Sequence, residues 1–185
     1  SKDTYVTDKI IDGNKVVSDA NVGRAGTLDL FRLFSETLLN GDGSQNELSR
    51  ILIKFDYSKL RELTGSKLDV NSSDFNAKLR LYDVRSGHVV PSNFNVIVFP
   101  LSQSFDEGVG RDVSSFRDID AANFVTASFS GGSATVWFAS GANKQGLLGS
   151  ENIDIISSGN LGSGVENLFK EQNFVLGTED MDIDV

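Results

Sequence analysis

The chain has 185 residues, of which 26 are acidic and 17 basic, and its formal net charge is −9. It has no cysteine and one histidine, which excludes disulfides, thiolate metal sites and cysteine nucleophiles and disfavours metal sites built from several imidazoles. A chain this acidic repels a nucleic-acid backbone, and it contains no run of about 18 apolar residues, so neither a nucleic acid nor a membrane is an expected partner.

Alternation of apolar and polar residues, the signature of half-buried strands, dominates the chain. Residues 27–34 can form a strand or begin an amphipathic helix that ends at Gly41, and we favour the strand. The stretch 48–58 is predicted as a strand. One face carries Ile51, Ile53 and Phe55, and the other carries Arg50, Leu52 and Lys54.

Two stretches predict helical turns. In YSKLRELTG, residues 57–65, Ser58 fits an N-cap, Leu60 and Leu63 share a face, and Gly65 fits a C-cap. This helix has one to two turns. SGVENLFKEQ, residues 163–172, predicts a second short turn.

Two strands are predicted in the middle of the chain. Residues 76–84 form a strand with one wet face, which has Ala77, Leu79 and Leu81 on one side and Asn76, Lys78 and Arg80 on the other. Residues 94–101 are apolar at nearly every position, which predicts a central strand covered on both faces.

The last third of the chain predicts a hairpin and two further strands. ANFVTASF and ATVWFAS flank Gly131-Gly132, a natural hairpin turn. Ile153 and Ile155 alternate in a following strand. At the end, Met181, Ile183 and Val185 alternate with Asp180, Asp182 and Asp184, whose charges discourage accidental edge pairing.

These elements predict an all-β fold, an antiparallel, jelly-roll-like β-sandwich with one or two short helical turns. No composition shift divides the chain, so we expect one domain over residues 1–185. Because residue 185 lies inside an alternating pattern, we also expect a longer protein that continues past it. An intact mass near 20.0 kDa for the native protein would contradict that expectation.

Six stretches, taken in order, resemble a known family. They are DTYV at 3–6, NVGRAGTLDLF at 21–31, SRILIKFDYSKL at 49–60, AKLRLYDV at 77–84, FPLSQSFDEGVGRD at 99–112 and AANFVTASF at 121–129. Together they resemble the DNRLRE-type β-sandwich domain, and most closely a branch among structural proteins of tailed bacteriophages of marine and cyanobacterial hosts. The chain departs from the pattern at Phe105 and Phe124, where related domains often have tryptophan.

The resemblance implies a non-enzymatic virion protein that docks on a repeating virion surface, in the tail assembly or as a head decoration. Its implied partners are other virion proteins, in several copies or as a homo-oligomer, and it needs no cofactor. The alternative is a carbohydrate-binding module of a surface or secreted protein, with or without calcium, because the same fold family includes glycan binders.

The strongest candidate site is SFDEGVGRD, residues 104–112. Asp106 and Glu107 could act as an acid/base pair, or could bind calcium together with Asp112 on a glycine turn. Adjacent strand residues point to opposite faces, which disfavours a converging pair. We favour a structural corner in which Phe105 fills the core and Gly108 and Gly110 form the bend. We therefore assign no catalytic, cofactor or metal residue.

Other candidates each have a structural alternative. The loops at 11–14 and 40–47 could bind a cation or form hairpin turns, and His88 is expected in a surface loop. Trp137 could fill the core, or it could be exposed and stack on a sugar or anchor a partner.

Basic residues on two strands form a further candidate. Arg50 and Lys54, together with Lys78 and Arg80, could form a basic patch that contacts the acidic final strand of an adjacent copy. The alternative is that they are ordinary solvated residues.

Overall fold

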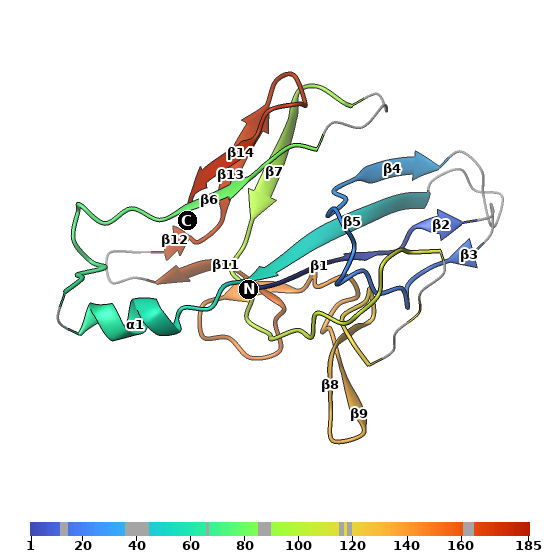
Figure 1. Cartoon of the computed structure of the whole chain (residues 1–185), viewed down its shortest axis with the longest axis horizontal. Helices are drawn as coiled ribbons and strands as arrows, with labels where there is room; N and C mark the ends of the chain where they lie inside the picture. The colour runs from blue at the N-terminus through green and yellow to red at the C-terminus, as the bar shows by residue number, and fades with distance from the viewer. Residues whose placement is uncertain are drawn as a thin grey trace. The chain divides into compact units, whose positions relative to one another are not determined.

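The computed structural model describes residues 1–11, 15–35, 45–65, 67–84, 90–114, 117, 120–160 and 165–185. Over these residues the chain forms many short strands, paired antiparallel, and one short helix, which confirms the all-β class (Figure 1). The sandwich packing remains a prediction. No helix among the described residues is long and apolar enough to cross a membrane.

The chain divides into two compact units, each built from two separate segments. Unit 1 contains Ser1–Phe55 and Leu101–Ile155, and unit 2 contains Asp56–Pro100 and Ile156–Val185. The sequence predicted one domain over residues 1–185. That the two units fold together as one domain stays a prediction.

Unit 1 contains a three-stranded sheet with β5 in the middle. β5 (Gln45–Lys54) pairs antiparallel with β1 (Lys2–Thr7) on one side and with β4 (Arg32–Ser35) on the other. The strand predicted over residues 27–34 therefore begins only at Arg32. β2 (Ile10–Ile11) and β3 (Lys15–Val16) form a two-residue ladder beside them.

The core of unit 1 forms around β1 and β5. Leu52 of β5 is buried, whereas Ile51 and Ile53 are half-buried and Phe55 is exposed, so the core side of β5 is the face that carries Leu52. The buried cluster consists of Val6, Leu52, Phe105, Ala122, Ala127, Trp137 and Ala142. The predicted core role of Phe105 is confirmed.

The predicted hairpin is present in unit 1. β8 (Thr126–Ser130) pairs with β9 (Ser133–Val136) around Gly131 and Gly132, whose φ angles are 61° and 84°. Positive φ at both central residues is what a tight hairpin turn requires, and glycine adopts it without steric cost. β10 (Gln145–Leu147) follows.

Unit 2 contains two pairs of strands that confirm one prediction and correct another. β6 (Lys78–Leu81) pairs with β14 (Met181–Asp184), and Leu79, Met181 and Ile183 are buried while Lys78, Arg80, Asp182 and Asp184 are exposed, as the alternation predicted. β7 (Phe94–Val98) was predicted to be central and covered on both faces, and this is wrong. Among the described strands it pairs only with β13 (Lys170–Phe174), and Asn95 and Ile97 are exposed.

The helix of unit 2 is α1 (Ser58–Thr64), as predicted, although its N-cap is Tyr57 instead of Ser58. The Ser58 N–H donates to the Asp56 carboxylate at 2.9 Å, and Gly65 is the C-cap with an ordinary right-handed φ of −75°. None of the residues of α1 is buried.

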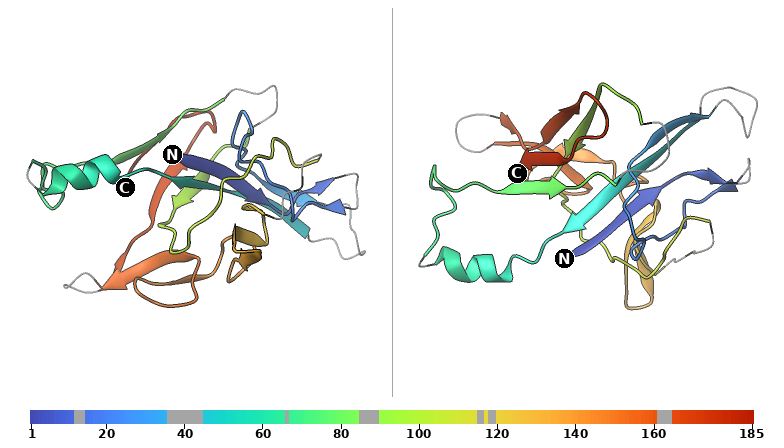
Figure 2. Two further views of the ribbon diagram at one scale, coloured as in Figure 1. Left: turned by 60° about the horizontal axis from the view of Figure 1, so that its bottom comes forward. Right: turned by 45° about the horizontal axis from the view of Figure 1, so that its top comes forward.

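The prediction of a second helical turn, at residues 163–172, is wrong. The described part of residues 163–172 forms β12 (Val165–Asn167), which pairs with β11 (Ile155–Asn160), and the start of β13. Figure 2 shows α1 and these strands from two further directions.

Candidate functional site

The corner at residues 104–112 uses its carboxylates as acceptors for backbone N–H groups. Glu107 Oε1 accepts the N–H of Asp3 on β1 at 2.9 Å. Asp106 Oδ2 accepts the N–H of Phe129 on β8 at 3.0 Å, and Lys2 Nζ lies 3.9 Å from Asp106 Oδ1. The two carboxylates thus accept backbone N–H groups of different strands. Because Asp106 and Glu107 lie outside the strands, the opposite-face argument does not account for this.

The third acid of the proposed calcium set is also engaged locally. Asp112 Oδ1 accepts the backbone N–H and the hydroxyl of Ser114, both at 2.8 Å. Over the described ranges of the chain, no group of three or more His, Cys, Asp or Glu side chains is arranged to hold a metal ion. The corner fits a structural role. His88, residues 12–14 of the first acidic loop and residues 40–44 of the second lie outside the described residues.

Asn21 holds this corner together, and sequence reasoning missed it. Its side chain is fully buried, and its Nδ2 donates to the carbonyl oxygens of Glu107 at 2.9 Å and Ala122 at 2.7 Å. Its Oδ1 accepts the N–H of Gly110 at 2.8 Å and of Gly23 at 3.2 Å. Both N–H groups and the oxygen of this one amide thus hold three segments of the chain together, and only Gly23, two residues further on, is local enough to leave a signal in the sequence.

The bend itself needs its glycines for two different reasons. Gly108 has a φ of +78°, in the left-handed region that other residues rarely adopt. Gly110 has no such φ, but a Cβ there would lie 1.7 Å from the carbonyl oxygen of Asn21. The predicted roles of Gly108 and Gly110 in the bend fit this geometry.

Trp137 is a core residue. Its ring is buried in the cluster of unit 1, and its Nε1–H donates to the carbonyl oxygen of Asn123 at 2.9 Å. Its neighbours Val136 and Phe138 are the exposed ones. Trp137 is thus unavailable for stacking on a sugar from solvent.

A second buried polar residue, Asp154, was also missed. It is fully buried, and its two carboxylate oxygens accept the N–H groups of Phe138, Ala139 and Lys144 at 2.8 to 2.9 Å. Those three donors lie in the loop that follows β9, so the carboxylate fixes that loop. The only sequence signal was its place between Ile153 and Ile155, an ordinary position for an outward-facing polar residue.

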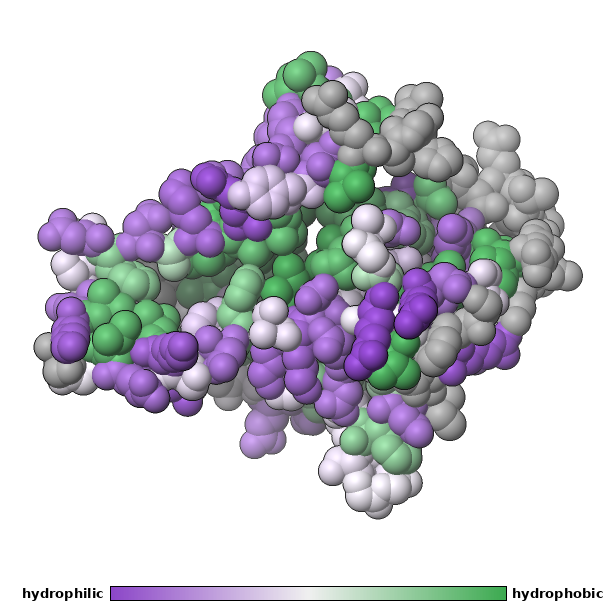
Figure 3. Space-filling model, viewed as in Figure 1, coloured by the Kyte–Doolittle hydropathy of each residue, from purple (hydrophilic) through white to green (hydrophobic). Residues whose placement is uncertain are grey.

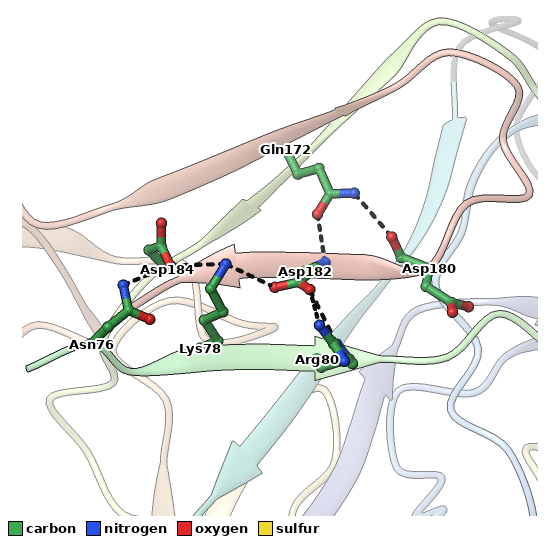
Figure 4. Close-up of polar contacts among 7 residues, drawn as sticks. All are labelled: Asn76, Lys78, Arg80, Gln172, Asp180, Asp182 and Asp184. Carbon is green, nitrogen blue, oxygen red and sulfur yellow. Dashed lines mark hydrogen bonds and ion pairs between the residues drawn. The ribbon is translucent and has the colours of Figure 1, made fainter.

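The exposed charged surface of unit 2 is a ladder across β6 and β14 (Figure 4). Lys78 Nζ lies 3.4 Å from Asp182 and 3.3 Å from Asp184, and Arg80 donates from both Nε and Nη2 to one oxygen of Asp182, Oδ2. Asn76 Nδ2 donates to Asp184 at 3.2 Å. We name Lys78, Arg80, Asp182 and Asp184 the charged ladder.

Ionisation of the charged ladder is shifted toward its charged forms. The hydrogen bond from Arg80 lowers the pKa of Asp182, and the one from Asn76 lowers the pKa of Asp184. The hydrogen bond to Asp184 raises the pKa of Lys78. The basic residues predicted to contact the acidic strand of an adjacent copy are thus paired with that strand in their own chain.

The other half of the predicted basic patch differs as well. Arg50 donates to the carbonyl oxygen of Gly141 and to the Asn143 side chain, both at 3.0 Å. Burial lowers its pKa. Arg50 therefore belongs to the internal bonding of unit 1.

The backbone of β14 and of the preceding Asp180 also forms hydrogen bonds with a side chain of β13. Gln172 of β13 donates from Nε2 to the Asp180 carbonyl at 3.0 Å, and its Oε1 accepts the Asp182 N–H at 2.8 Å (Figure 4). The amide thus bonds backbone groups as a neighbouring strand would.

Apolar side chains are also exposed at the surface, and Figure 3 shows apolar patches between hydrophilic ones. In unit 2 the most exposed large apolar residues are Tyr82, Val84, Val175, Leu176 and Val185. In unit 1, Val136, Phe138, Leu147 and Leu148 are exposed. These surfaces are available to a protein partner.

Comparison with known proteins adds no relative: no family model, no curated protein and no solved structure matches the chain. The resemblance to the DNRLRE-type domain stays a prediction.

Proposed function

We propose that the chain is a non-enzymatic structural protein of a tailed bacteriophage virion, which docks on a repeating virion surface in the tail assembly or as a head decoration. The observation that supports the non-enzymatic part of this proposal is that the carboxylates of the strongest candidate site, residues 104–112, are engaged in structural hydrogen bonds. The carboxylates of Asp106 and Glu107 hold backbone N–H groups of separate strands and leave no converging acid/base pair. The motif order described above supports the virion assignment.

A structural role also suits the surface. Function in an assembly module lies on sheet faces and loops, where exposed apolar side chains contact a partner and charged neighbours set its orientation. Many copies on one particle would multiply a weak contact into stable attachment.

The test is the composition of the particles. Virions of the phage whose genome encodes the chain are banded on a density gradient and analysed by mass spectrometry and by immunogold labelling. We expect peptides of the chain to co-band with particles in several copies, and gold on the tail or head. Expression of the chain in the lysate without any peptide or label in the banded virions would contradict the proposal.

The glycan-binding alternative loses its main aromatic candidate, because Trp137 is buried. A glycan array with and without a calcium chelator separates the two functions. Specific, chelator-sensitive retention of one sugar class would favour the alternative over the virion role.

A further inference from the structure

The loop between β13 and β14 presents apolar side chains on a fixed backbone. Val175 and Leu176 are 56% and 69% exposed. The Glu179 carboxylate accepts the N–H groups of Val175, Leu176 and Thr178 at 2.7 to 3.0 Å. The hydrogen bond from the Leu176 N–H lowers the pKa of Glu179. Gly177 has a φ of +79°, and a Cβ there would lie 1.9 Å from the Pro91 carbonyl oxygen. The loop therefore has little freedom to fold its apolar side chains back.

The segment after β6 extends this surface. Tyr82 and Val84 are 72% and 65% exposed, and the Asp83 N–H donates to the Asp180 carboxylate at 2.9 Å, which ties the segment to the start of β14. We name the apolar–acidic tip by its residues Tyr82, Asp83, Val84, Val175, Leu176, Glu179 and Asp180. Figure 3 shows apolar surface at the end of the β13–β14 loop, at the top of the view.

The acids of the tip differ from those of the charged ladder. Among the described residues, no ion pair includes Asp83, Glu179 or Asp180, whereas Asp182 and Asp184 pair with Lys78 and Arg80. An apolar surface bordered by carboxylates that have no ion-pair partner in the described part of the chain favours a partner with apolar side chains bordered by cations.

α1, in the same unit, offers such a surface. Lys59 and Leu63 lie four residues apart on α1, Leu60 lies beside Leu63, and Leu63 is 43% exposed. Lys67 lies beyond the C-cap Gly65, and its N–H donates to the Leu63 carbonyl oxygen at 2.9 Å. No ion pair within the described part of the chain includes Lys59 or Lys67. A seven-residue helix with no buried residue gains little stability by itself, so a covering partner would stabilise it. We name Lys59, Leu60, Leu63 and Lys67 the basic helix face.

We propose that the apolar–acidic tip of one copy docks on the basic helix face of a second copy, head to tail. Leu176 and Val175 would pack on Leu60 and Leu63, and the tip carboxylates would lie beside Lys59 and Lys67. Figures 1 and 2 show the β13–β14 loop and α1 at separate ends of unit 2, so each copy keeps one surface free for the next. Such a heterologous contact generates rings or filaments.

This inference rests on the proposed assembly role only for its biological setting. The contact is small, so we expect weak self-association that a repeating particle would strengthen. Because the test uses the purified chain alone, its failure leaves the virion proposal open, and absence from virions leaves the self-association result unchanged.

The experiment is sedimentation velocity of the purified chain over a concentration series up to about 1 mM, the range in which small, transient interfaces are measured. Three variants carry the same substitution at exposed leucines: Leu176→Gln in the tip, Leu63→Gln in the helix face, and Leu147→Gln on β10 as the matched control. We expect the wild type and the control to grow beyond dimers as concentration rises, and both interface variants to stay monomeric.

Mixing gives the decisive result. The Leu176→Gln variant keeps its helix face and the Leu63→Gln variant keeps its tip, so an equimolar mixture should form 1:1 dimers and nothing larger. Monomeric wild type at every concentration, growth that neither variant reduces, or a mixture that stays monomeric would each overturn the proposal. Far-UV circular dichroism checks that every variant is folded.

A charge exchange provides a second test that removes no apolar contact. Lys59→Glu should weaken self-association, and mixing it with Asp83→Lys should restore a contact between the two variants. Because exposed charges are screened by salt, wild-type association should also fall between about 0.1 M and 1 M NaCl. Association that strengthens with salt and ignores both charge variants would contradict the acid–base part of the contact.

Discussion

Asn21 and Gly110 approach each other so closely that no side chain fits between them. Asn21 Oδ1 accepts the Gly110 N–H at 2.8 Å, and the Asn21 backbone carbonyl oxygen would lie 1.7 Å from a Cβ on Gly110. The contact joins residues 89 positions apart and closes the corner that carries Asp106 and Glu107.

We predict that Gly110→Ala destabilises unit 1 by more than about 3 kcal/mol, because the added methyl meets backbone that cannot move without breaking the Asn21 network. Chemical denaturation measures the change. Gly26→Ala is the matched control, since a Cβ at Gly26 meets nothing within 4 Å. Equal stability of the two variants would contradict the packing.

Asp154→Ala is expected to cost about 3 kcal/mol or more, since it removes a fully buried carboxylate and leaves the N–H groups of three part-buried hydrogen bonds without their acceptor. Asp154→Asn, which keeps the shape and one acceptor oxygen, should cost less. Denaturant midpoints of both variants give the order, and a loss of under about 1 kcal/mol in the alanine variant would show that water replaces the carboxylate.

The charged ladder predicts acid sensitivity of unit 2. The pKa values of Asp182 and Asp184 are lowered in the folded chain, so their contribution is present above their unfolded pKa of about 3.9 and is lost as pH falls through the folded values. Melting temperatures should therefore drop more steeply below about pH 4 in the wild type than in the Asp182→Asn/Asp184→Asn variant. Glu171→Gln, at an exposed position of β13 outside the charged ladder, is the control and should keep the wild-type slope.

We predict that Tyr5 ionises at unusually high pH. Burial first, and then the nearby Asp29 carboxylate, raise the pKa of Tyr5 to about 12. The raised value means that its contribution to stability is complete below the unfolded pKa of about 10 and is lost as pH rises through 12. Ultraviolet absorbance of phenolate should show a step near pH 12 that Tyr5→Phe removes; an unchanged step in that variant would assign it elsewhere.

Trp137 is the one tryptophan of the chain, so its fluorescence reports its environment directly. Because the ring is buried, we expect blue-shifted emission, weak quenching by acrylamide and no change on adding glycans. Trp137→Phe, which loses the bond to Asn123, should cost about 1 to 3 kcal/mol. Red-shifted, readily quenched emission in the native protein would contradict the burial.

Sequence reasoning succeeded where the signal is local. The alternation of Leu79 with Lys78 and Arg80, and of Ile183 with Asp182 and Asp184, predicts the faces of β6 and β14, because side chains alternate along a strand. Gly131-Gly132 predicts its turn for a similar reason, since the required φ belongs to those two residues.

It failed where the decisive partners are distant. Asn21 looks like an ordinary loop residue and Asp154 like an outward-facing strand residue, and only backbone groups brought in by the fold make them structural. β7 failed for another reason: a continuous apolar run does not reveal how many strands will flank it. The pairing of β6 with β14 in one chain could not be deduced either, because charge complementarity fits a second copy equally well.

The interleaving of the two units has a consequence for synthesis. Unit 1 takes Ser1–Phe55 and Leu101–Ile155, so β1 and β5 leave the ribosome long before Phe105 and Trp137 arrive to fill the core beside them. Residues 56–100 are synthesised before their strand partners. β6 and β7 pair with β14 and β13, which are the last strands to be made. Nascent chains halted before about residue 140 should remain protease-sensitive, because the late segment that completes the first core is still missing.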